Sequence, residues 1–347
     1  MNKVFKNIPR ILFGKGTLCR IDELIYSFEK KRIVFILDHR IPSVNLEQFK
    51  TKNIDIITFP ASKGEPTTNQ VDTLTEKIKK NNNPEVIVGI GGGSTLDVAK
   101  SVSIMLTNPG KSENYQGWDL VKNPPIHKIG IPTLPGSGSE ASRTAVLFGP
   151  EKKFGINSDY SMFDGLILDS DLMKTLPKDQ KFFTGMDCYI HCVESLTGTF
   201  INSLSKTYAE KALDLCTNSF LKKYNADEMI VASYLGGASI VNSEVGICHA
   251  LSYGLSLEFK IRHGIANCIV FKNLGEFYDE HVEKFIKLLD ISNIKLPENI
   301  SKNFTKDILK RMTNMTLQMD KPLTNALGVN WKKIMTPKKI EEIYMKM

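Results

Sequence analysis

Short apolar runs rich in β-branched residues alternate with polar, helix-like segments through the first half of the chain. Turn residues such as Asn81-Asn82-Asn83-Pro84 separate these segments. The alternation is typical of a parallel sheet whose faces are covered by helices. The strands that it predicts are Arg32–Leu37, Ile54–Phe59, Val86–Gly89, Lys128–Pro132 and Leu166–Asp169.

The second half of the chain has a different pattern. From about Pro177 onward, long amphipathic stretches replace the strand candidates. The clearest of them are Lys206–Tyr224, Asp227–Ser243 and His281–Leu289. Proline also favours an extended residue before it, so the Leu176-Pro177 step marks a boundary. Because 347 residues exceed the usual size of one core, we expect an α/β domain at residues 1–177 and an all-α domain at residues 178–347.

Composition argues against several classes of protein. No stretch reaches the ~18 uninterrupted apolar residues of a membrane-spanning helix, and the first residues lack the apolar run of a secretion signal. We therefore expect a cytoplasmic protein whose six cysteines are reduced thiols. The formal net charge of +7 comes from scattered lysines, without the basic, aromatic stripe of a nucleic-acid-binding protein. This charge mildly favours anionic small molecules.

Three consecutive glycines, Gly91, Gly92 and Gly93, follow the predicted strand Val86–Gly89, and Ser94 then starts a helix. Glycine permits a sharp turn and a close approach of the backbone to a ligand, and the N-terminus of a helix attracts phosphate. The segment therefore predicts a pyrophosphate cradle. It lacks the Gly-x-Gly-x-x-Gly fingerprint, so a tight strand-to-helix turn without a ligand is the alternative.

A second turn of small residues, Ile131–Glu140, follows another predicted strand, and Thr133, Ser137 and the nearby Ser142 offer hydroxyls. Turns at the carboxyl ends of parallel strands meet at the crevice where open α/β sheets bind nucleotides. Asp38 follows the first strong strand, where a carboxylate can bind a ribose and repel a 2′-phosphate, which favours NAD over NADP. A capped helix start is the alternative for the second turn, and a helix cap is the alternative for Asp38.

A carboxylate and three histidines form a candidate metal site. Asp187 and His191 are four residues apart in a helix-like segment, so they project from one face and can reach one ion. His249 and His263 lie farther on, in a segment dense in small residues. Each histidine alone fits a structural role, but a buried carboxylate beside three imidazoles is poorly matched without a cation. Three nitrogens and one oxygen suit Fe(II), Zn(II), Ni(II) or Co(II).

Together these segments resemble the iron-containing (group III) alcohol dehydrogenase family, whose relatives include glycerol dehydrogenase and dehydroquinate synthase. The resemblance runs from Arg10 to about Tyr278. The motifs that carry it are Gly91–Lys100, Pro132–Glu140, Leu176-Pro177, Gly185–His191 and the pair His249 and His263. It implies a dehydroquinate synthase-like fold, with a Rossmann-like N-terminal nucleotide-binding domain, an all-α C-terminal metal-binding domain and a metal in the cleft between them.

The resemblance also implies roles for individual residues. It assigns a divalent metal, Fe2+ or Zn2+, to Asp187, His191, His249 and His263. It assigns NAD to a larger set of residues: Asp38, Gly91, Gly92, Gly93, Ser94, Thr133, Ser137, Ser142 and Lys153. A homodimer or larger homo-oligomer is the assembly that it implies.

Three features depart from the family's usual pattern. Tyr253 stands where many members have a histidine that relays protons near the nicotinamide, so proton release through Tyr253, solvent or a substrate group stays open. Arg143 and Arg262 stand where alcohol-specific members often have small or neutral residues, which suggests an anionic substrate. The segment beyond Ile294 is short and does not match the usual long helical end.

Within the family, the chain looks most like the 3-deoxy-D-manno-octulosonate (Kdo) 8-oxidase branch, notably in Asn114–Lys122, Ser139–Thr144 and Gly185–Glu194. That branch oxidises the C8 hydroxyl of this acidic sugar to an aldehyde, which an aminotransferase partner converts to the 8-amino sugar for lipopolysaccharide. The cation would act as a Lewis acid while the alcohol carbon releases hydride.

Other functions stay open at this point. Within the same family, the chain could be an NAD-dependent alcohol or polyol dehydrogenase with another substrate. A dehydroquinate-synthase-like lyase and a catalytically silent nucleotide-binding sensor are further alternatives. The electron acceptor, NAD or oxygen, is also open.

Overall fold

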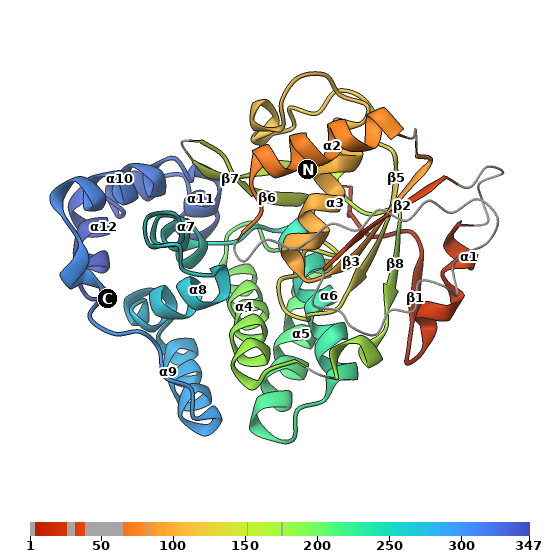
Figure 1. Cartoon of the computed structure of the whole chain (residues 1–347). Helices are drawn as coiled ribbons and strands as arrows, with labels where there is room; N and C mark the ends of the chain where they lie inside the picture. Colours follow the sequence, from red (N-terminus) through yellow and green to blue (C-terminus); the bar gives the residue numbers. More distant parts are fainter. Residues whose placement is uncertain (1–3, 26–31, 39–64, 82–83, 151, 175) are drawn as a thin grey trace. The chain divides into compact units, whose positions relative to one another are not determined.

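The structure is a computed structural model that describes residues 4–25, 32–38, 65–81, 84–150, 152–174 and 176–347. Its contacts divide the chain into two compact units (Figure 1). The α/β unit comprises Lys6–Thr175, and the helical unit comprises Leu176–Met347 with the first residues of the chain. Among these first residues, Phe5 meets Tyr208 of the helical unit edge-on, with ring centroids 5.5 Å apart.

In the part of the chain that the structure describes, the α/β unit is built on a five-stranded parallel sheet with the order β1-β8-β5-β3-β2. In that order its strands are Ile11–Phe13, Gly165–Leu168, His127–Pro132, Val86–Gly91 and Ile33–Leu37. The predicted α/β class is confirmed, and four of the predicted strands match β2, β3, β5 and β8 to within two residues. The predicted strand Ile54–Phe59 lies outside the described residues. β1 escaped prediction because a strand of three residues is too short to show a periodic pattern.

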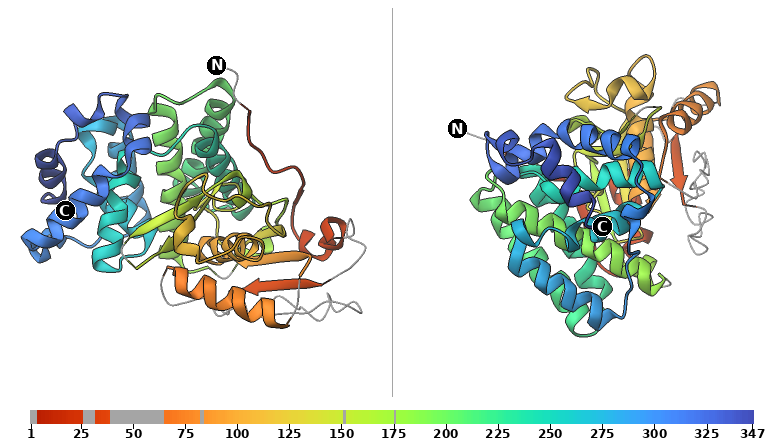
Figure 2. Two further views of the ribbon diagram at one scale, coloured as in Figure 1. Left: turned by 90° about the horizontal axis from the view of Figure 1, so that it is seen from above. Right: turned by 90° about the vertical axis from the view of Figure 1, so that its left-hand side faces the viewer.

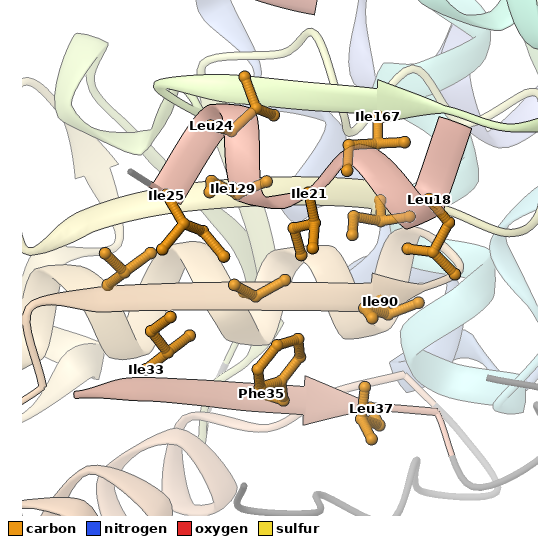
Figure 3. Packing of buried hydrophobic residues seen from close by; sticks show 13 residues of the cluster. Leu18, Ile21, Leu24, Ile25, Ile33, Phe35, Leu37, Ile90, Ile129 and Ile167 are labelled. Carbon is orange, nitrogen blue, oxygen red and sulfur yellow. The ribbon is translucent and has the colours of Figure 1, made fainter. Parts of the chain in front are cut away.

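Both faces of this sheet are covered, which explains why its strands are apolar at nearly every position. On one face, alternate residues of β2 and the neighbouring strands pack beneath η1 (Thr17–Arg20) and α1 (Asp22–Ile25) (Figure 3). On the other face lies α3 (Gly93–Met105). Gly89 lets this helix approach closely, because a Cβ at Gly89 would lie 2.7 Å from the Cβ of Ala99.

A smaller three-stranded sheet completes the α/β unit, with the order β4-β7-β6. Its strands are β4 (Gly117–Trp118), β7 (Lys153–Asn157) and β6 (Thr144–Phe148). The sequence did not predict them, since they are short and carry polar residues at their ends. The other helices among the described residues of the unit are α2 (Thr68–Asn81), η3 (Ser112–Tyr115), η4 (Asp159–Ser161) and η5 (Ser170–Met173).

The helical unit contains no strand within residues 176–347, which confirms the predicted all-α class. Figure 2 shows its helices from two further sides, with α4, α5 and α6 packed together. Its helices are α4 (Lys178–Thr197), α5 (Ser203–Leu221), α6 (Ala226–Asn242), α7 (Ile247–Phe259), α8 (His263–Lys272), α9 (Gly275–Ser292), η6 (Ile300–Asn303), α10 (Lys306–Leu317), α11 (Asp320–Leu327), η7 (Trp331–Lys333) and α12 (Pro337–Tyr344). The predicted amphipathic stretches correspond to α5, α6 and part of α9.

The C-terminal segment corrects an expectation. Residues beyond Ile294 form α10, α11 and α12, and α10 packs against both α7 and α12. Tyr344 of α12 is fully buried, and its hydroxyl donates to the carbonyl oxygen of Leu251 in α7 at 2.8 Å. The tail is therefore an integral helical part of the unit, held by side chains from distant helices.

No single helix among the described residues is long and apolar enough to cross a membrane. α6 and α7 together have the required length and apolar composition, but they are bent by 105° relative to each other.

Candidate metal centre and nucleotide-binding turns

One face of α4 carries the first two predicted metal ligands. Asp187 and His191 are one helical turn apart and both are buried, so α4 presents them side by side. The Nε2 atom of His191 lies 3.7 Å from Oδ1 of Asp187. α4 can lie close to α5 here because Gly185 has no side chain, and a Cβ at that position would lie 2.5 Å from the ring of Phe220.

Two other helices bring the remaining histidines to the same carboxylate. His249 lies in the first turn of α7 and His263 is the first residue of α8. Their Nε2 atoms lie 3.4 Å and 3.7 Å from Oδ1 of Asp187, respectively. The rings of His191 and His249 are stacked, with centroids 4.7 Å apart. The structure thus brings the three predicted histidine ligands together around one oxygen of the fourth, Asp187.

The donor set fits a divalent transition metal. Ligand atoms of Asp187, His249 and His263 all lie within 4.8 Å of one another. Asn267, one turn after His263 in α8, places its Nδ2 at 2.6 Å from Oδ1 of Asp187 and 3.2 Å from Nε2 of both His249 and His263. The amide NH2 group of Asn267 thus lies among an oxygen and two nitrogens whose lone pairs would also bind a cation. Within the described ranges, Nδ1 of His191 and Oδ1 of Asn267 are buried atoms without a hydrogen-bond partner.

The electrostatics of the cluster agree with its composition. Burial opposes ionisation of Asp187, but His191, His263 and His249 together hold its pKa well below the usual range. Burial lowers the pKa of His191, which keeps that imidazole neutral and able to donate a lone pair. Burial also opposes protonation of His249, yet Glu194 and Asp187 raise its pKa to about 10. At neutral pH this raised pKa leaves the ring of His249 with a second proton, which a cation bound at the same nitrogen would displace.

Tyr253, one of the three routes for proton release that the sequence left open, lies one turn after His249 in α7 and is partly buried. Its ring meets that of His263 edge-on, with centroids 5.6 Å apart. The phenol is therefore a neighbour of the ligand cluster, as the sequence position suggested. Its role in proton release stays a prediction.

The two predicted substrate arginines differ in their surroundings. Arg143 is buried in the α/β unit, where its Nε donates to Oδ1 of Asp159 at 2.7 Å and its Nη2 donates to Asp119. These two carboxylates already neutralise and orient the guanidinium, which weakens its case as a substrate anchor. Arg262 is exposed and directly precedes His263 at the N-terminus of α8. Arg262 is thus the better candidate for an anionic group.

The two glycine-rich turns are neighbours in the α/β unit. They follow β3 and β5, which pair in parallel from Val86 with His127 to Gly91 with Pro132. The backbone N–H of Thr133 donates to the carbonyl of Gly91 at 2.9 Å. A Cβ at Gly93 would lie 2.8 Å from Oγ of Ser137, so the absence of a side chain lets the turns touch. Both turns therefore lie at the carboxyl edge of the sheet.

Other predicted cofactor residues surround these turns to different degrees. Ser94 is exposed in the first turn of α3, and Asp38 follows β2, where its backbone N–H donates to the carbonyl of Ile90 at 3.0 Å. Ser142 is buried and donates to the carbonyl of Thr144 at 3.0 Å. Lys153 is buried in β7, 3.4 Å from the Glu65 carboxylate. This ion pair with Glu65 favours a structural role for Lys153 at least as much as a role in binding the cofactor.

Sequence reasoning missed the buried lysine that organises the second turn. Lys100 of α3 is fully buried, and its Nζ donates to the carbonyl oxygens of Ser139, Ser142 and Thr144. Asp97, one turn earlier in α3, accepts hydrogen bonds from Oγ of Ser139 at 2.6 Å and from the backbone of Val146 at 3.1 Å. The three-residue spacing of Asp97 and Lys100 on one helix face was the available signal.

Asn267 and Glu194 were missed for a similar reason. Asn267 lies four residues after His263, and Glu194 lies three residues after His191, so both share a helix face with a predicted ligand. Polar residues at such spacings are common on exposed faces, and only the folded structure shows that both side chains are buried against ligands.

A parallel α/β unit with paired glycine-rich turns and a helical unit with a carboxylate and imidazole cluster together favour a nucleotide-dependent metalloenzyme. Family models narrow this class. Residues 9–170 match the iron-containing alcohol dehydrogenase model, and residues 181–344 match the C-terminal model of the Fe-containing alcohol dehydrogenase family. The chain belongs to the iron-containing alcohol dehydrogenase family.

Individual relatives agree with this placement. Sulfoacetaldehyde reductase from Bilophila wadsworthia is 29% identical over 304 residues, which are 83% of this chain and 78% of that protein. Alcohol dehydrogenase from Oenococcus oeni has a similar structure, with a TM-score of 0.86, 21% identity and coverage of 99% and 100% of the two chains. Sulfoacetaldehyde reductase from Bifidobacterium kashiwanohense, solved in complex with NAD+, gives a TM-score of 0.82 at 20% identity and covers 99% and 98%.

Family membership decides several earlier alternatives. The chain is an enzyme of a family whose members are alcohol and aldehyde oxidoreductases, which argues against the silent sensor and the lyase. The family uses a metal ion and NAD. The expectation that the tail departs from the family is wrong, because the C-terminal model extends to residue 344 and so includes α10, α11 and α12.

Proposed function

We propose that this chain is a metal-dependent, NAD-linked oxidoreductase that interconverts a primary alcohol and an aldehyde on a small anionic substrate. The observation that carries the proposal is that the Nε2 atoms of His191, His249 and His263 all lie within 3.7 Å of Oδ1 of Asp187. When bound there, a divalent cation would supply Lewis acidity that lowers the pKa of an alcohol.

The chain's own residues would perform the other tasks. The turns at Gly91–Gly93 and Pro132–Ser142 would bind the pyrophosphate of NAD through backbone N–H groups and hydroxyls. NAD bound there would supply the acceptor for the hydride of the alcohol carbon, and the hydroxyl proton would leave the substrate as the aldehyde forms. Tyr253, beside His263, is the proposed route for that proton.

Two observations support an anionic substrate. Arg262 is exposed immediately before the ligand His263, where a guanidinium can bind a carboxylate or sulfonate. In addition, the relative from Bilophila wadsworthia is named for an aldehyde that carries a sulfonate. We propose an acidic sugar with a terminal primary alcohol, with Kdo and its C8 hydroxyl as the first candidate.

Substrate and metal can be tested in one experiment. Metal-reconstituted enzyme is incubated with Kdo, sulfoacetaldehyde and neutral polyols, with the matching form of NAD or without it. NADH absorbance and trapping of the aldehyde with a hydrazine report turnover and separate NAD from oxygen as the acceptor. Turnover of neutral polyols alone would overturn the anionic assignment.

The metal ligands are tested by Asp187→Ala and His263→Ala. Both variants should lose bound metal and turnover together, because each removes one of the side chains that would bind the metal directly. Either variant with full metal content and normal turnover would contradict the assignment. The homodimer, the cytoplasmic location and the aminotransferase partner stay predictions, which size measurement and co-purification can test.

A further inference from the structure

Glu194 is a fully buried carboxylate on the face of α4 that carries the predicted metal ligands. It follows Asp187 by seven residues and His191 by three, so the three side chains project from neighbouring turns of one helix face. A buried carboxylate needs strong hydrogen-bond partners to offset its desolvation. Glu194 finds them in α7, the helix that carries His249.

The two oxygens of Glu194 have different partners. Oε1 accepts the backbone N–H of Cys248 at 2.6 Å and lies 3.4 Å from the backbone nitrogen of His249. Oε2 lies 2.5 Å from Nδ1 of the His249 ring. One carboxylate therefore holds both the backbone and the side chain of the same histidine.

The backbone contact completes a helix that cannot cap itself. α7 begins after Gly246, which offers no side-chain cap, and Glu194 supplies the acceptor from another helix. Gly246 also makes room, because a Cβ there would lie 3.1 Å from Oε1 of Glu194 and 2.7 Å from the hydroxyl of Tyr278. A negative charge at this end is favoured by the helix dipole as well.

The ring contact decides which nitrogen of His249 faces the cluster. A carboxylate only accepts hydrogen bonds, so it favours the ring form with the proton on Nδ1. Nε2, which lies 3.4 Å from Oδ1 of Asp187, then keeps its lone pair for a metal ion. Carboxylates beside metal-bound histidines commonly fix the ring in this way.

We propose that Glu194 is a positioning residue of the metal centre, which sets the orientation and tautomer of His249 while it caps α7. The inference rests on the proposed metal site. The alternative is that Glu194 only stabilises the start of α7, which predicts a loss of stability without a specific loss of metal affinity.

Glu194→Gln separates these two roles. The amide oxygen of glutamine can still accept the Cys248 N–H, but its NH2 group would then face Nδ1 of His249. That nitrogen must become an acceptor, which moves the ring proton to Nε2, where it blocks the metal ion. We expect Co2+ affinity to fall about 10- to 100-fold, the range typical for such supporting carboxylates.

The matched control is Asn225→Ala, which removes the cap of α6. The Asn225 side chain accepts the backbone N–H groups of Asp227 and Glu228, at 3.0 Å and 3.4 Å, and Asn225 belongs to no predicted site. Co2+ binding is followed by competition with a chelator and by the visible absorption of the bound ion. Thermal unfolding of the metal-free proteins measures the loss of cap.

The expected result is weak Co2+ binding for Glu194→Gln and wild-type binding for Asn225→Ala, with similar thermal shifts for both. Equal Co2+ affinities in all three proteins would overturn the proposal. Failure of wild type to bind Co2+, or binding by Asp187→Ala, would instead overturn the proposed metal site. If Glu194→Gln does not fold, 15N spectra of zinc-loaded wild type decide: Nε2 of His249 should bind zinc and Nδ1 should carry a proton, and the reverse would refute the role of Glu194.

Discussion

Replacing Lys100 with methionine should destabilise the α/β unit and weaken NAD binding together. Lys100 is fully buried, and methionine has a similar length but no charge and no donor. The change leaves the carbonyls of Ser139, Ser142 and Thr144 without the ammonium that now joins them. Ser139 and Ser142 lie in or beside the second turn, which is predicted to bind the nucleotide, and Thr144 is the first residue of β6 directly after it.

The magnitude follows from the charges that the variant leaves behind. Nζ of Lys100 lies 4.0 Å from Oδ1 of Asp97, and removing one partner of a buried ion pair costs about 3–5 kcal/mol. Burial lowers the pKa of Lys100 to about 8 and raises that of Asp97 to about 6, so both groups are charged at pH 7. Asp97→Asn in the Lys100→Met background should therefore recover part of the loss, because it removes one of the two buried carboxylate charges, Asp97 and Glu140, that interact with Lys100.

Urea unfolding at pH 7, followed by circular dichroism, measures the free energy of unfolding, and calorimetric titration measures NAD+ affinity. Loosening of the turn by the worth of one hydrogen bond, about 1.4 kcal/mol, would weaken NAD+ binding about tenfold. Lys80→Met is the control, since Lys80 is exposed on α2 and its loss should change stability by less than about 0.5 kcal/mol. A Lys100→Met protein as stable as this control, or a double variant no better than the single one, would refute the reasoning.

Three further predictions concern the turns, the substrate and pH. Gly93→Ala should weaken NAD+ binding about tenfold in calorimetric titration, because its Cβ would lie 2.8 Å from Oγ of Ser137, whereas Gly275→Ala, with nothing within 4 Å, should not. Arg262→Gln should raise KM for an anionic substrate about 10- to 100-fold in steady-state assays, since it removes one charged hydrogen bond, and should leave KM for a neutral alcohol unchanged. The third prediction concerns His249 in the metal-free protein. Burial lowers the pKa of His249, but its carboxylate neighbours raise it to about 10. This value lies above the pKa near 6.5 that the residue has in the unfolded chain. The stabilisation from this proton is then complete below about pH 6.5 and is lost as pH rises towards 10, so the difference in unfolding free energy between wild type and His249→Gln should shrink across that range; a difference independent of pH would contradict this.

Local sequence patterns were sufficient to predict the class of fold and the main candidates for chemistry. Apolar runs located β2, β3, β5 and β8, because a strand that is buried on both faces is apolar at most of its positions. The glycine turn after β3 was visible for an equally local reason, since glycine is the residue that permits close backbone contacts. The spacing of Asp187 and His191 placed them on one helix face before any tertiary contact was known.

Which distant groups meet could not be predicted from these patterns and depends on the packing of the whole fold. Nothing local to Glu194 or Lys100 shows that the first supports His249 or that the second binds the carbonyls of another loop. The two carboxylates that engage Arg143 likewise come from separate segments, at Asp119 and Asp159. The helices beyond Ile294 contain only 8 to 12 residues each, and much of their stability comes from packing on α7 and on one another. Local patterns reflect local backbone preferences, whereas a buried polar group is decided by partners that only the completed fold supplies.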